Sequence, residues 1–198
     1  MGFRIRRCCV EYPKAIGFPA MGSALLNLQR AILAGQPSLT QLLRQTKLIA
    51  ARLTLDDVEH WLDQELAGYV RTSEPPDYRR VFTQSLEVYN AHRGTWQFAG
   101  KLNFAFKAHQ PIAQIESFSR EERVALPVSK NFLIKNDLGD SFGSNWPQQF
   151  VVPGSQYKRV ITAVVERWAG ELGKRGIAIF DIQKFMAAFD EVTELPAR

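Results

Sequence analysis

Three residues of one predicted helix have side chains that could bind a divalent metal. Asp56, His60 and Asp63 are spaced i, i+4 and i+7, which places them on one face of a helix. Such a face could supply part of a metal site for phosphodiester hydrolysis. The alternative is a solvated acidic surface, because no HxxxH or HExxH motif is present. The nuclease hypothesis requires that a further carboxylate converge with these three side chains in a cleft.

Aromatic residues and lysines are interleaved between residues 95 and 107. Aromatic rings beside cations could stack the bases of a nucleic acid. A sheet face buried against the core explains the same aromatic residues without any ligand. The residues concerned are Trp96, Phe98, Phe104, Phe106, Lys101 and Lys107.

The segment from residue 62 to 81 contains two tyrosines, two prolines and three arginines at the end of a predicted helix. Gly68 is a residue type that often follows a helix C-terminus, and the prolines prevent the helix from continuing. Two hypotheses account for the remaining polar residues. In the first, Glu65 and Arg79 pair across the corner and join the helix to the following strand. In the second, the corner is an exposed binding surface around Tyr69, Tyr78, Arg79 and Arg80, with Glu65 as a further candidate binding residue.

No other part of the sequence shows a catalytic pattern. The GDSF segment at 139–142 resembles the nucleophile block of GDSL-type hydrolases, but its place in a glycine-rich loop favours a turn. The spacings of phosphate-binding loops do not occur. We therefore expect no cofactor, and we favour a non-enzymatic protein over an enzyme.

Hydrophobic periodicity predicts three amphipathic helices in the N-terminal part of the chain. Each begins at a residue that can cap a helix, namely Ser23, Ser38 and Thr54. Short connections between them favour an antiparallel arrangement, so we expect a compact three-helix bundle.

From Tyr78 the pattern becomes that of strands. Residues 78–90 are predicted to form one strand, 92–94 a turn, and 95–108 a second strand or two short ones. The small β segment formed in this way is expected to be antiparallel.

Helices are expected again in the last part of the chain. A short helix with loops is predicted after Pro111, a strong helix capped by Ser155, and a last helix near residues 181–192. We expect these C-terminal helices to pack back on the N-terminal bundle, and we predict an α+β fold.

The basic character of the chain is concentrated at its start. The net charge is +5, yet residues 1–20 hold four basic residues and one acidic residue, whereas residues 21–198 hold 21 and 19. This near balance of charges argues against a continuous basic surface on the main domain. No apolar run reaches the roughly 18 residues of a membrane helix, so we expect a protein without a membrane partner.

The chain is expected to comprise one domain at residues 21–198. Met21 opens the first amphipathic helix, so residues 1–20 are interpreted as a flexible extension that arises from start-site choice. The only cysteines, Cys8 and Cys9, lie in this extension. A cysteine-free domain is consistent with a cytoplasmic location.

A distinctive block begins in the third predicted helix and continues beyond it, with a Trp, a Glu-Leu pair, a Gly-Tyr pair and a Pro-x-Tyr-Arg motif. Its residues are Trp61, Glu65, Leu66, Gly68, Tyr69, Pro76, Tyr78 and Arg79. The helices and this block resemble the AbiTii domain, a family tied to abortive infection in bacterial anti-phage defence. The segment RWAGELGKRGI resembles the closing helix of that family, residues 90–150 match poorly, and the helix after Ile177 lies outside the resemblance.

The resemblance implies a role in phage defence, as an effector, a sensor or an adaptor, and it implies no settled reaction. We expect action through a protein partner or self-association, with nucleic acid as a further partner class. The alternatives are a metal-dependent nuclease that uses the three helix residues named above, and a nucleic-acid-binding module.

Overall fold

The computed structural model is a mixed α+β fold, and it describes residue 28 and residues 38–70, 72–128 and 146–174. The helices are α2 (Leu39–Arg52), α3 (Asp56–Ala67), the 3-10 helix η1 (Asp77–Arg79), α4 (Ile112–Arg120) and α6 (Gly154–Gly173). The strands are β1 (Arg80–Phe82), β2 (Ser85–Asn90), β3 (Thr95–Lys101), β4 (Ala105–Lys107), β5 (Arg123–Pro127) and β6 (Gln148–Pro153). Within these described segments, no helix combines the length and apolar character needed to cross a membrane.

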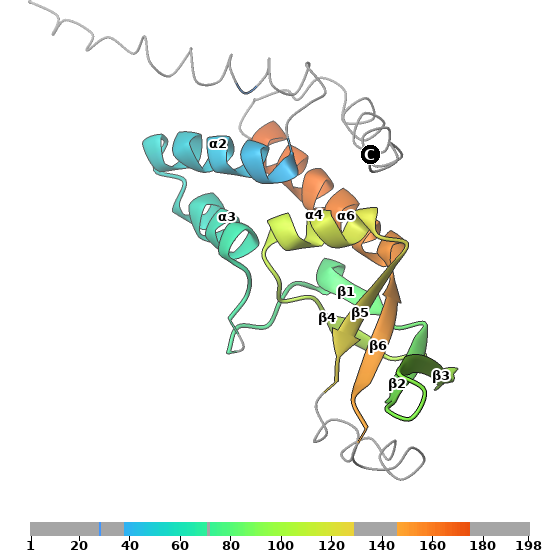
Figure 1. The fold of residues 1–198 in the computed structure, drawn as a ribbon. Helices are drawn as coiled ribbons and strands as arrows, with labels where there is room; N and C mark the ends of the chain where they lie inside the picture. The colour runs from blue at the N-terminus through green and yellow to red at the C-terminus, as the bar shows by residue number, and fades with distance from the viewer. Residues whose placement is uncertain (1–27, 29–37, 71, 129–145, 175–198) are drawn as a thin grey trace, which may run out of the picture.

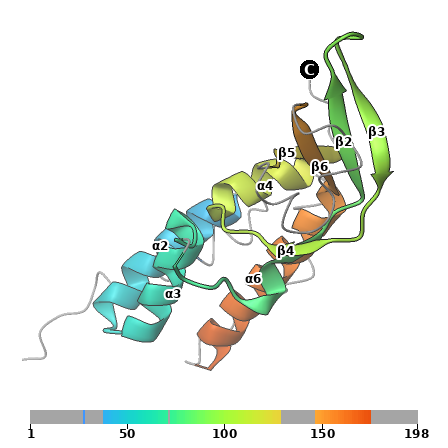
Figure 2. The same ribbon diagram turned by 90° about the horizontal axis from the view of Figure 1, so that it is seen from below.

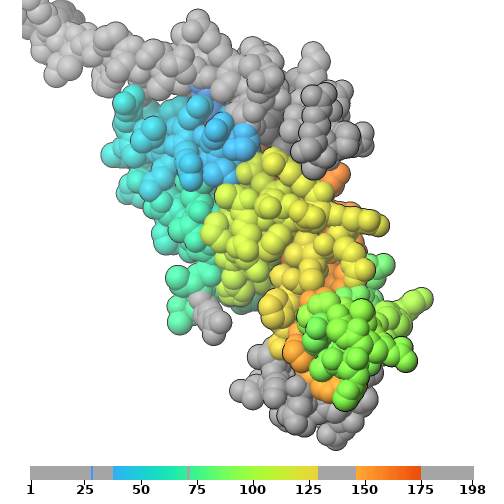
Figure 3. Space-filling view, in the orientation of Figure 1, coloured from blue at the N-terminus to red at the C-terminus, as the bar shows by residue number. Residues whose placement is uncertain are grey.

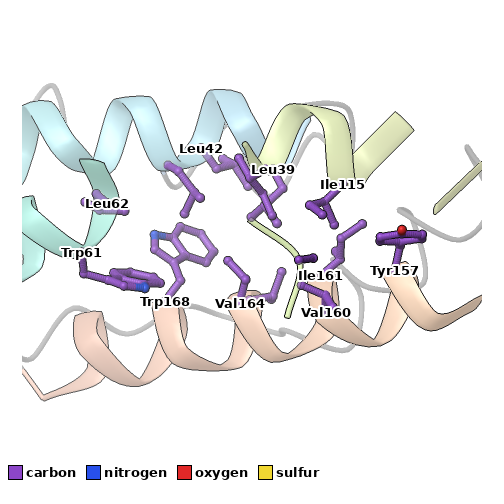
Figure 4. Close-up of a cluster of buried hydrophobic side chains, with 14 of the residues drawn as sticks. Leu39, Leu42, Trp61, Leu62, Ile115, Tyr157, Val160, Ile161, Val164 and Trp168 are labelled. Atoms are coloured by element: carbon purple, nitrogen blue, oxygen red, sulfur yellow. The ribbon is translucent and has the colours of Figure 1, made fainter. Parts of the chain in front are cut away.

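Four helices enclose the main hydrophobic core, at the end of the molecule opposite the β2–β3 hairpin (Figure 1). α6 lies along the other helices and buries apolar residues at helical spacing. Its Trp168 is fully buried, and the indole Nε1 donates to the hydroxyl of Thr46 at 2.8 Å. Core side chains of all four helices are shown in Figure 4, including Leu39, Leu42, Trp61, Leu62, Ile115, Tyr157, Val160, Ile161, Val164 and Trp168.

The N-terminus of α2 is bound by a buried carboxylate from α4. Glu116 accepts hydrogen bonds from the backbone N–H of Leu39 (2.7 Å) and from the N–H and hydroxyl of Thr40 (3.3 and 2.5 Å). The first N–H groups of a helix have no partner within the helix, and they attract negative charge. The Ser38 hydroxyl accepts from the N–H of Gln41 at 3.3 Å, so the predicted start of this helix is confirmed.

The strands form two antiparallel sheets. Strands β1 and β4 make one pair, and the other sheet has four strands in the order β3-β2-β6-β5. The β2–β3 hairpin projects away from the helices in Figure 2, and in Figure 3 it is the green region at the far end from α2. β3 is therefore an edge strand of the four-stranded sheet.

The single strand predicted for residues 78–90 is divided between these two sheets. Tyr78 lies in η1, β1 belongs to the two-stranded sheet, and β2 belongs to the four-stranded sheet. At the division, the Thr83 hydroxyl donates to the carbonyl of Leu102 (2.7 Å) and accepts from the N–H of Phe104 (3.0 Å). Side-chain bonds of this kind replace ladder bonds and interrupt a strand. Within residues 95–108, the second alternative, two short strands, is confirmed.

Strands β5 and β6 were not predicted. β5 directly follows α4, and β6 runs straight into α6 through Pro153. The centre of β6 is the short apolar run from Phe150 to Val152, which is buried on both faces. Such a run lacks the alternation that identifies a half-exposed strand.

Two predicted helix starts are wrong. α3 begins after Leu55, without a side-chain cap, because Thr54 has a positive φ of 52°. α6 begins at Gly154, one residue before the predicted cap at Ser155, because the preceding strand ends at Pro153.

The three-helix N-terminal bundle is not confirmed as predicted. α2 and α3 pack together, and the other described core helices, α4 and α6, come from later in the chain. Of the first predicted helix, Leu28 is helical and buried. The rest of that helix, residues 1–20, the GDSF segment and the helix predicted at 181–192 lie outside the described residues.

Candidate functional site

The chain turns between Glu65 of α3 and Arg79 of η1, and we call this part of the structure the corner. It contains a buried ion pair. Arg79 Nη2 lies 2.5 Å from Glu65 Oε2, and the exposed fraction of both side chains is 0%. Because Glu65 belongs to α3 and Arg79 to η1, the pair joins the helix to the start of β1. The first hypothesis for the corner, an ion pair between these two residues, is confirmed.

Two tyrosines complete the partners of Glu65. The hydroxyls of Tyr69 and Tyr78 both donate to Oε1, at 2.8 and 2.7 Å. Burial raises the pKa of Tyr69 well above its ordinary value of 10.0, and the adjacent Glu65 carboxylate raises it further. The same two causes raise the pKa of Tyr78. Both phenols therefore keep their protons to a higher pH than an ordinary tyrosine.

Arg79 also holds the segment that connects β4 to α4. Its Nη1 donates to the carbonyl oxygens of Ala108 (3.0 Å) and Gln110 (2.6 Å). The guanidinium carbon lies 4.7 Å from the centre of the Tyr69 ring, a cation–π distance. The backbone N–H of Tyr69 donates to the carbonyl of His109 at 2.8 Å. The corner thus binds α3, η1 and the β4–α4 connection into one unit.

Gly68 is required where the chain turns out of α3. Its φ of 87° and ψ of 163° lie in a region that only glycine adopts readily. A Cβ here would lie 2.8 Å from the carbonyl oxygen of His109 and 3.0 Å from the nitrogen of Pro111. The prediction that Gly68 ends the helix is confirmed, and the close approach of the β4–α4 connection is a second reason for glycine.

An exposed arginine of α6 attaches that helix to the corner. The Arg167 guanidinium carbon lies 4.8 Å from the centre of the Trp61 ring and 5.8 Å from that of Tyr78. Trp61 Nε1 donates to the Tyr78 hydroxyl at 2.9 Å, and Arg167 Nη1 donates to the same oxygen at 3.4 Å. Tyr78 therefore links α3, η1 and α6.

Among the residues predicted to form an exposed binding surface at the corner, Arg80 is the exposed one. Its guanidinium lies 3.5 Å from Asp77, and 53% of its side chain is exposed. Tyr78 is half-buried, and the remaining three residues are buried. The predicted exposure is wrong for Tyr69 and Arg79, because both side chains are buried and bond to the buried Glu65. A binding role for the corner stays a prediction.

The three candidate metal ligands of α3 are all exposed. Asp63 pairs with Lys47 of α2, and this hydrogen bond raises the pKa of Lys47. His60 Nε2 lies 3.3 Å from the amide nitrogen of Gln64. Across residues 38–70, 72–128 and 146–174, no three His, Cys, Asp or Glu side chains gather where they could hold a metal ion. The convergence that the nuclease hypothesis requires is therefore not found in these ranges for Asp56, His60 and Asp63.

The aromatic residues between 95 and 107 divide into an exposed pair and a packed pair. In β3, Trp96 is 43% exposed and Phe98 is 65% exposed. In contrast, the Phe104 ring stacks on Phe150 with centroids 5.9 Å apart, and Phe106 packs against the main core. The interpretation as a buried sheet face is therefore right for Phe104 and Phe106 and wrong for Trp96 and Phe98.

The two lysines of the same segment also differ. Lys107 lies 2.7 Å from a carboxylate oxygen of Glu74 and 2.9 Å from one of Asp77, and these bonds raise its pKa. Lys101 is exposed and has no ion pair within the described part of the chain. Only Lys101 therefore remains available to a ligand.

A β-bulge places Lys101 on the same face of the sheet as the two exposed rings. Directly opposed residues of an antiparallel pair point to one face, and every second residue of a strand repeats it. The opposed pairs on this face are Tyr89 with Trp96, Glu87 with Phe98, and Ser85 with Lys101. Lys101 is three positions after Phe98, so without the irregularity between Leu86 and Glu87 it would point to the other face. We call Glu87, Tyr89, Trp96, Phe98 and Lys101 the hairpin face.

The carboxylate in the hairpin face is bonded to side chains of two other strands of the same sheet. Glu87 Oε1 pairs with Arg123 of β5, and Oε2 accepts from the Gln149 amide of β6 at 2.8 Å. Tyr89 meets Trp96 edge to face, with centroids 5.4 Å apart. Sequence reasoning did not identify Glu87, Tyr89 or Arg123. The first two lie on β2 and the third lies on β5, and the pairing of both strands with β6 was not predicted.

Comparison with known families gives a match that includes the residues of the corner. The AbiTii family model matches residues 23–185, which is most of the chain. The chain belongs to the AbiTii family. AbiTii proteins are tied to abortive infection, a form of bacterial anti-phage defence. No curated protein and no solved structure matches the chain.

The sequence block that suggested AbiTii is also the block that builds the corner. Trp61, Glu65, Tyr69, Tyr78 and Arg79 are joined by the hydrogen bonds and the ion pair described above. In this AbiTii chain, the block therefore specifies an internal connection between helix and sheet.

Proposed function

We propose that this AbiTii protein acts in abortive infection by binding another macromolecule through the hairpin face, without a catalytic step of its own. The observation that carries the proposal is the exposure of two large aromatic side chains, Trp96 and Phe98, on one strand. Exposed apolar patches are a feature of interaction sites, and aromatic residues are enriched among those that dominate binding energy.

The fold supports the hairpin face in a fixed position. β2 pairs with β6, and β6 continues directly into α6, the long helix of the core. Arg167 of α6 contacts the corner in turn. A rigid support lowers the entropy lost when a partner binds, so the corner contributes to binding by holding the sheet in place. Arg80 remains a candidate for a secondary contact, because it is exposed at the start of β1.

An effector, a sensor and an adaptor would each need such a recognition face. A cytoplasmic location and self-association belong to the same proposal. Fractionation of the expressing cells and light scattering of the purified chain measure these two properties.

The experiment is phage challenge of a bacterial host that expresses the full chain. We expect the double variant Trp96→Ala/Phe98→Ala to lose protection, measured as plaque number, or to lose growth arrest where expression alone is toxic. Leu48→Ala is the matched control, because Leu48 is an equally exposed apolar residue (67%) on α2, and we expect it to behave as wild type. Immunoblots establish equal protein levels. If the double variant protects as well as wild type, the proposal is wrong.

A further inference from the structure

Resting on the proposed function, we infer that the ligand of the hairpin face is single-stranded nucleic acid, with bases stacked on Trp96 and Phe98 and phosphates beside Lys101. Every base has a flat face that can stack on an aromatic ring, so such a site tolerates many sequences. In a duplex these faces are already covered by neighbouring bases. The geometry therefore points to an unpaired strand.

The spacing of Trp96 and Phe98 suits bases that are no longer stacked on each other. Trp96 and Phe98 are residues i and i+2 of β3 on one face, which puts their Cα atoms roughly 7 Å apart. That is about twice the 3.4 Å between neighbouring bases in one strand of a duplex. Recognition of single strands typically splays bases apart in this way and stacks them on the aromatic side chains of a sheet.

One ring is already held in position before a ligand binds. Tyr89 contacts Trp96 edge to face, with an angle of 61° between the rings. Edge-to-face packing stabilises the orientation of a ring, and 43% of the Trp96 side chain remains exposed. An oriented ring loses less conformational entropy when a base stacks on it.

The charges around the rings suit a phosphate backbone. Lys101 lies on the hairpin face beyond Phe98, and Arg93 is exposed in the turn at the other end of β3. No ion pair engages either cation within the described residues. The acidic Glu87 is paired with Arg123, whose side chain is 58% exposed. The face thus has one cation beyond Phe98, a second cation in the adjoining turn, and one carboxylate that is already paired.

Strand addition by a protein, or by a second copy of this chain, suits β3 less well. Edge pairing favours a flat, regular strand, and bulges and lysines are features that oppose it. β3 carries both, because the bulge lies opposite Leu86 and Lys101 ends the strand. The same features favour a ligand that lies across the face over a partner that extends the sheet.

The test is fluorescence anisotropy of the full chain with labelled oligonucleotides of one mixed sequence, prepared as single-stranded DNA, single-stranded RNA and duplex DNA. We expect a single strand to bind more tightly than the duplex, and the comparison of DNA with RNA identifies the source. Trp96→Ala and Phe98→Ala should each weaken binding about 5- to 150-fold. Leu48→Ala should bind as wild type.

Salt dependence tests the cations separately from the rings. Each phosphate contact contributes about −0.7 to the slope of log affinity against log salt for a single strand. Lys101→Ala should make this slope shallower by about that amount, whereas Phe98→Ala should weaken binding and leave the slope unchanged. An unchanged slope in Lys101→Ala would contradict the assignment of Lys101 to a phosphate.

The inference and the proposed function can fail independently. If no oligonucleotide binds, or if the alanine variants bind as wild type, or if the duplex binds as tightly as the single strands, single-stranded nucleic acid is not the ligand. Loss of phage protection in Trp96→Ala/Phe98→Ala would then still support the hairpin face, with a protein or a second copy as partner. If binding is lost and protection is unchanged, the inference stands and the proposed function is wrong.

Discussion

The corner and the hairpin face contain the same kinds of residue, yet the fold uses them in opposite ways. Each region combines aromatic rings with arginine or lysine and one glutamate. At the corner, Glu65 and Arg79 are buried and bond to each other and to their neighbours. At the hairpin face, Trp96, Phe98 and Lys101 are exposed. Residue type alone therefore does not separate a structural cluster from a binding surface.

The physical difference is the number of elements that surround each region. The corner is enclosed by α3, η1, α6 and the β4–α4 connection, so its charges have left water and need internal partners. The exposed residues of the hairpin face, Trp96, Phe98 and Lys101, lie on the edge strand β3, one side of which has no neighbouring strand in the described structure. Changes at the corner should therefore act on stability, and changes at the hairpin face should act on binding.

The largest expected loss of stability comes from breaking the buried pair. Arg79→Ala leaves the Glu65 carboxylate buried without its cation, which should lower the free energy of unfolding by about 3–5 kcal/mol. Urea denaturation followed by circular dichroism measures the change. Arg80→Ala is the matched control, because it removes the neighbouring exposed arginine at an expected cost of about 0.5 kcal/mol or less. Equal losses in the two variants would contradict the difference between interior and surface.

A smaller effect at the corner should appear at alkaline pH. Because burial and the Glu65 carboxylate raise the pKa of Tyr69 above 10.0, the folded chain keeps a proton that the unfolded chain releases. The stabilisation is complete below pH 10, and the free energy of unfolding falls as pH rises above it.

Tyr69→Phe removes this titrating proton. The free energy of unfolding should then fall less steeply with pH, by about 1.4 kcal/mol per pH unit. Urea midpoints of wild type and variant between neutral and alkaline pH provide the measurement. Parallel declines in the two proteins would show that the Tyr69 phenol does not couple to folding.

The smallest change in stability is expected at the hairpin face. Trp96→Ala should lower the free energy of unfolding by about 1 kcal/mol or less, since the ring is exposed and loses mainly its contact with Tyr89. Trp168→Ala, the same substitution in the core, should cost about 3–5 kcal/mol. Thermal and urea denaturation of both variants give the comparison. A loss in Trp96→Ala as large as that in Trp168→Ala would mean that the hairpin face is structural.

Local sequence patterns predicted the elements whose signals are contained within a short window. Helical periodicity located α2, α3 and α6, and the turn at residues 92–94 located the β2–β3 hairpin. The change of period was placed at Tyr78, two residues before β1 begins at Arg80. β5 and β6 were missed because their burial depends on strands far away in the chain, and a short apolar run does not reveal its partners.

The predictions of the candidate sites were limited in the same way, because they too depended on distant segments of the chain. The sequence allowed both an ion pair and an exposed surface at the corner, because Glu65 and Arg79 are compatible with either until α6 and the β4–α4 connection cover them. The metal hypothesis for Asp56, His60 and Asp63 depended on a ligand from another element, which a single helix cannot supply. The aromatic pattern of residues 95–107 could not separate the exposed rings of Trp96 and Phe98 from the packed rings of Phe104 and Phe106.

The sequence by itself determined the α+β class, the AbiTii membership and the glycine at the helix end, because these depend on residue types at short spacing. Only the tertiary structure decided that Arg79 is buried while Trp96 is exposed, and that Lys101 shares a face with Phe98. The reason is that burial depends on which distant elements cover a residue, and the face of a strand depends on register and bulges. Both are properties of pairs of segments, which no single segment specifies.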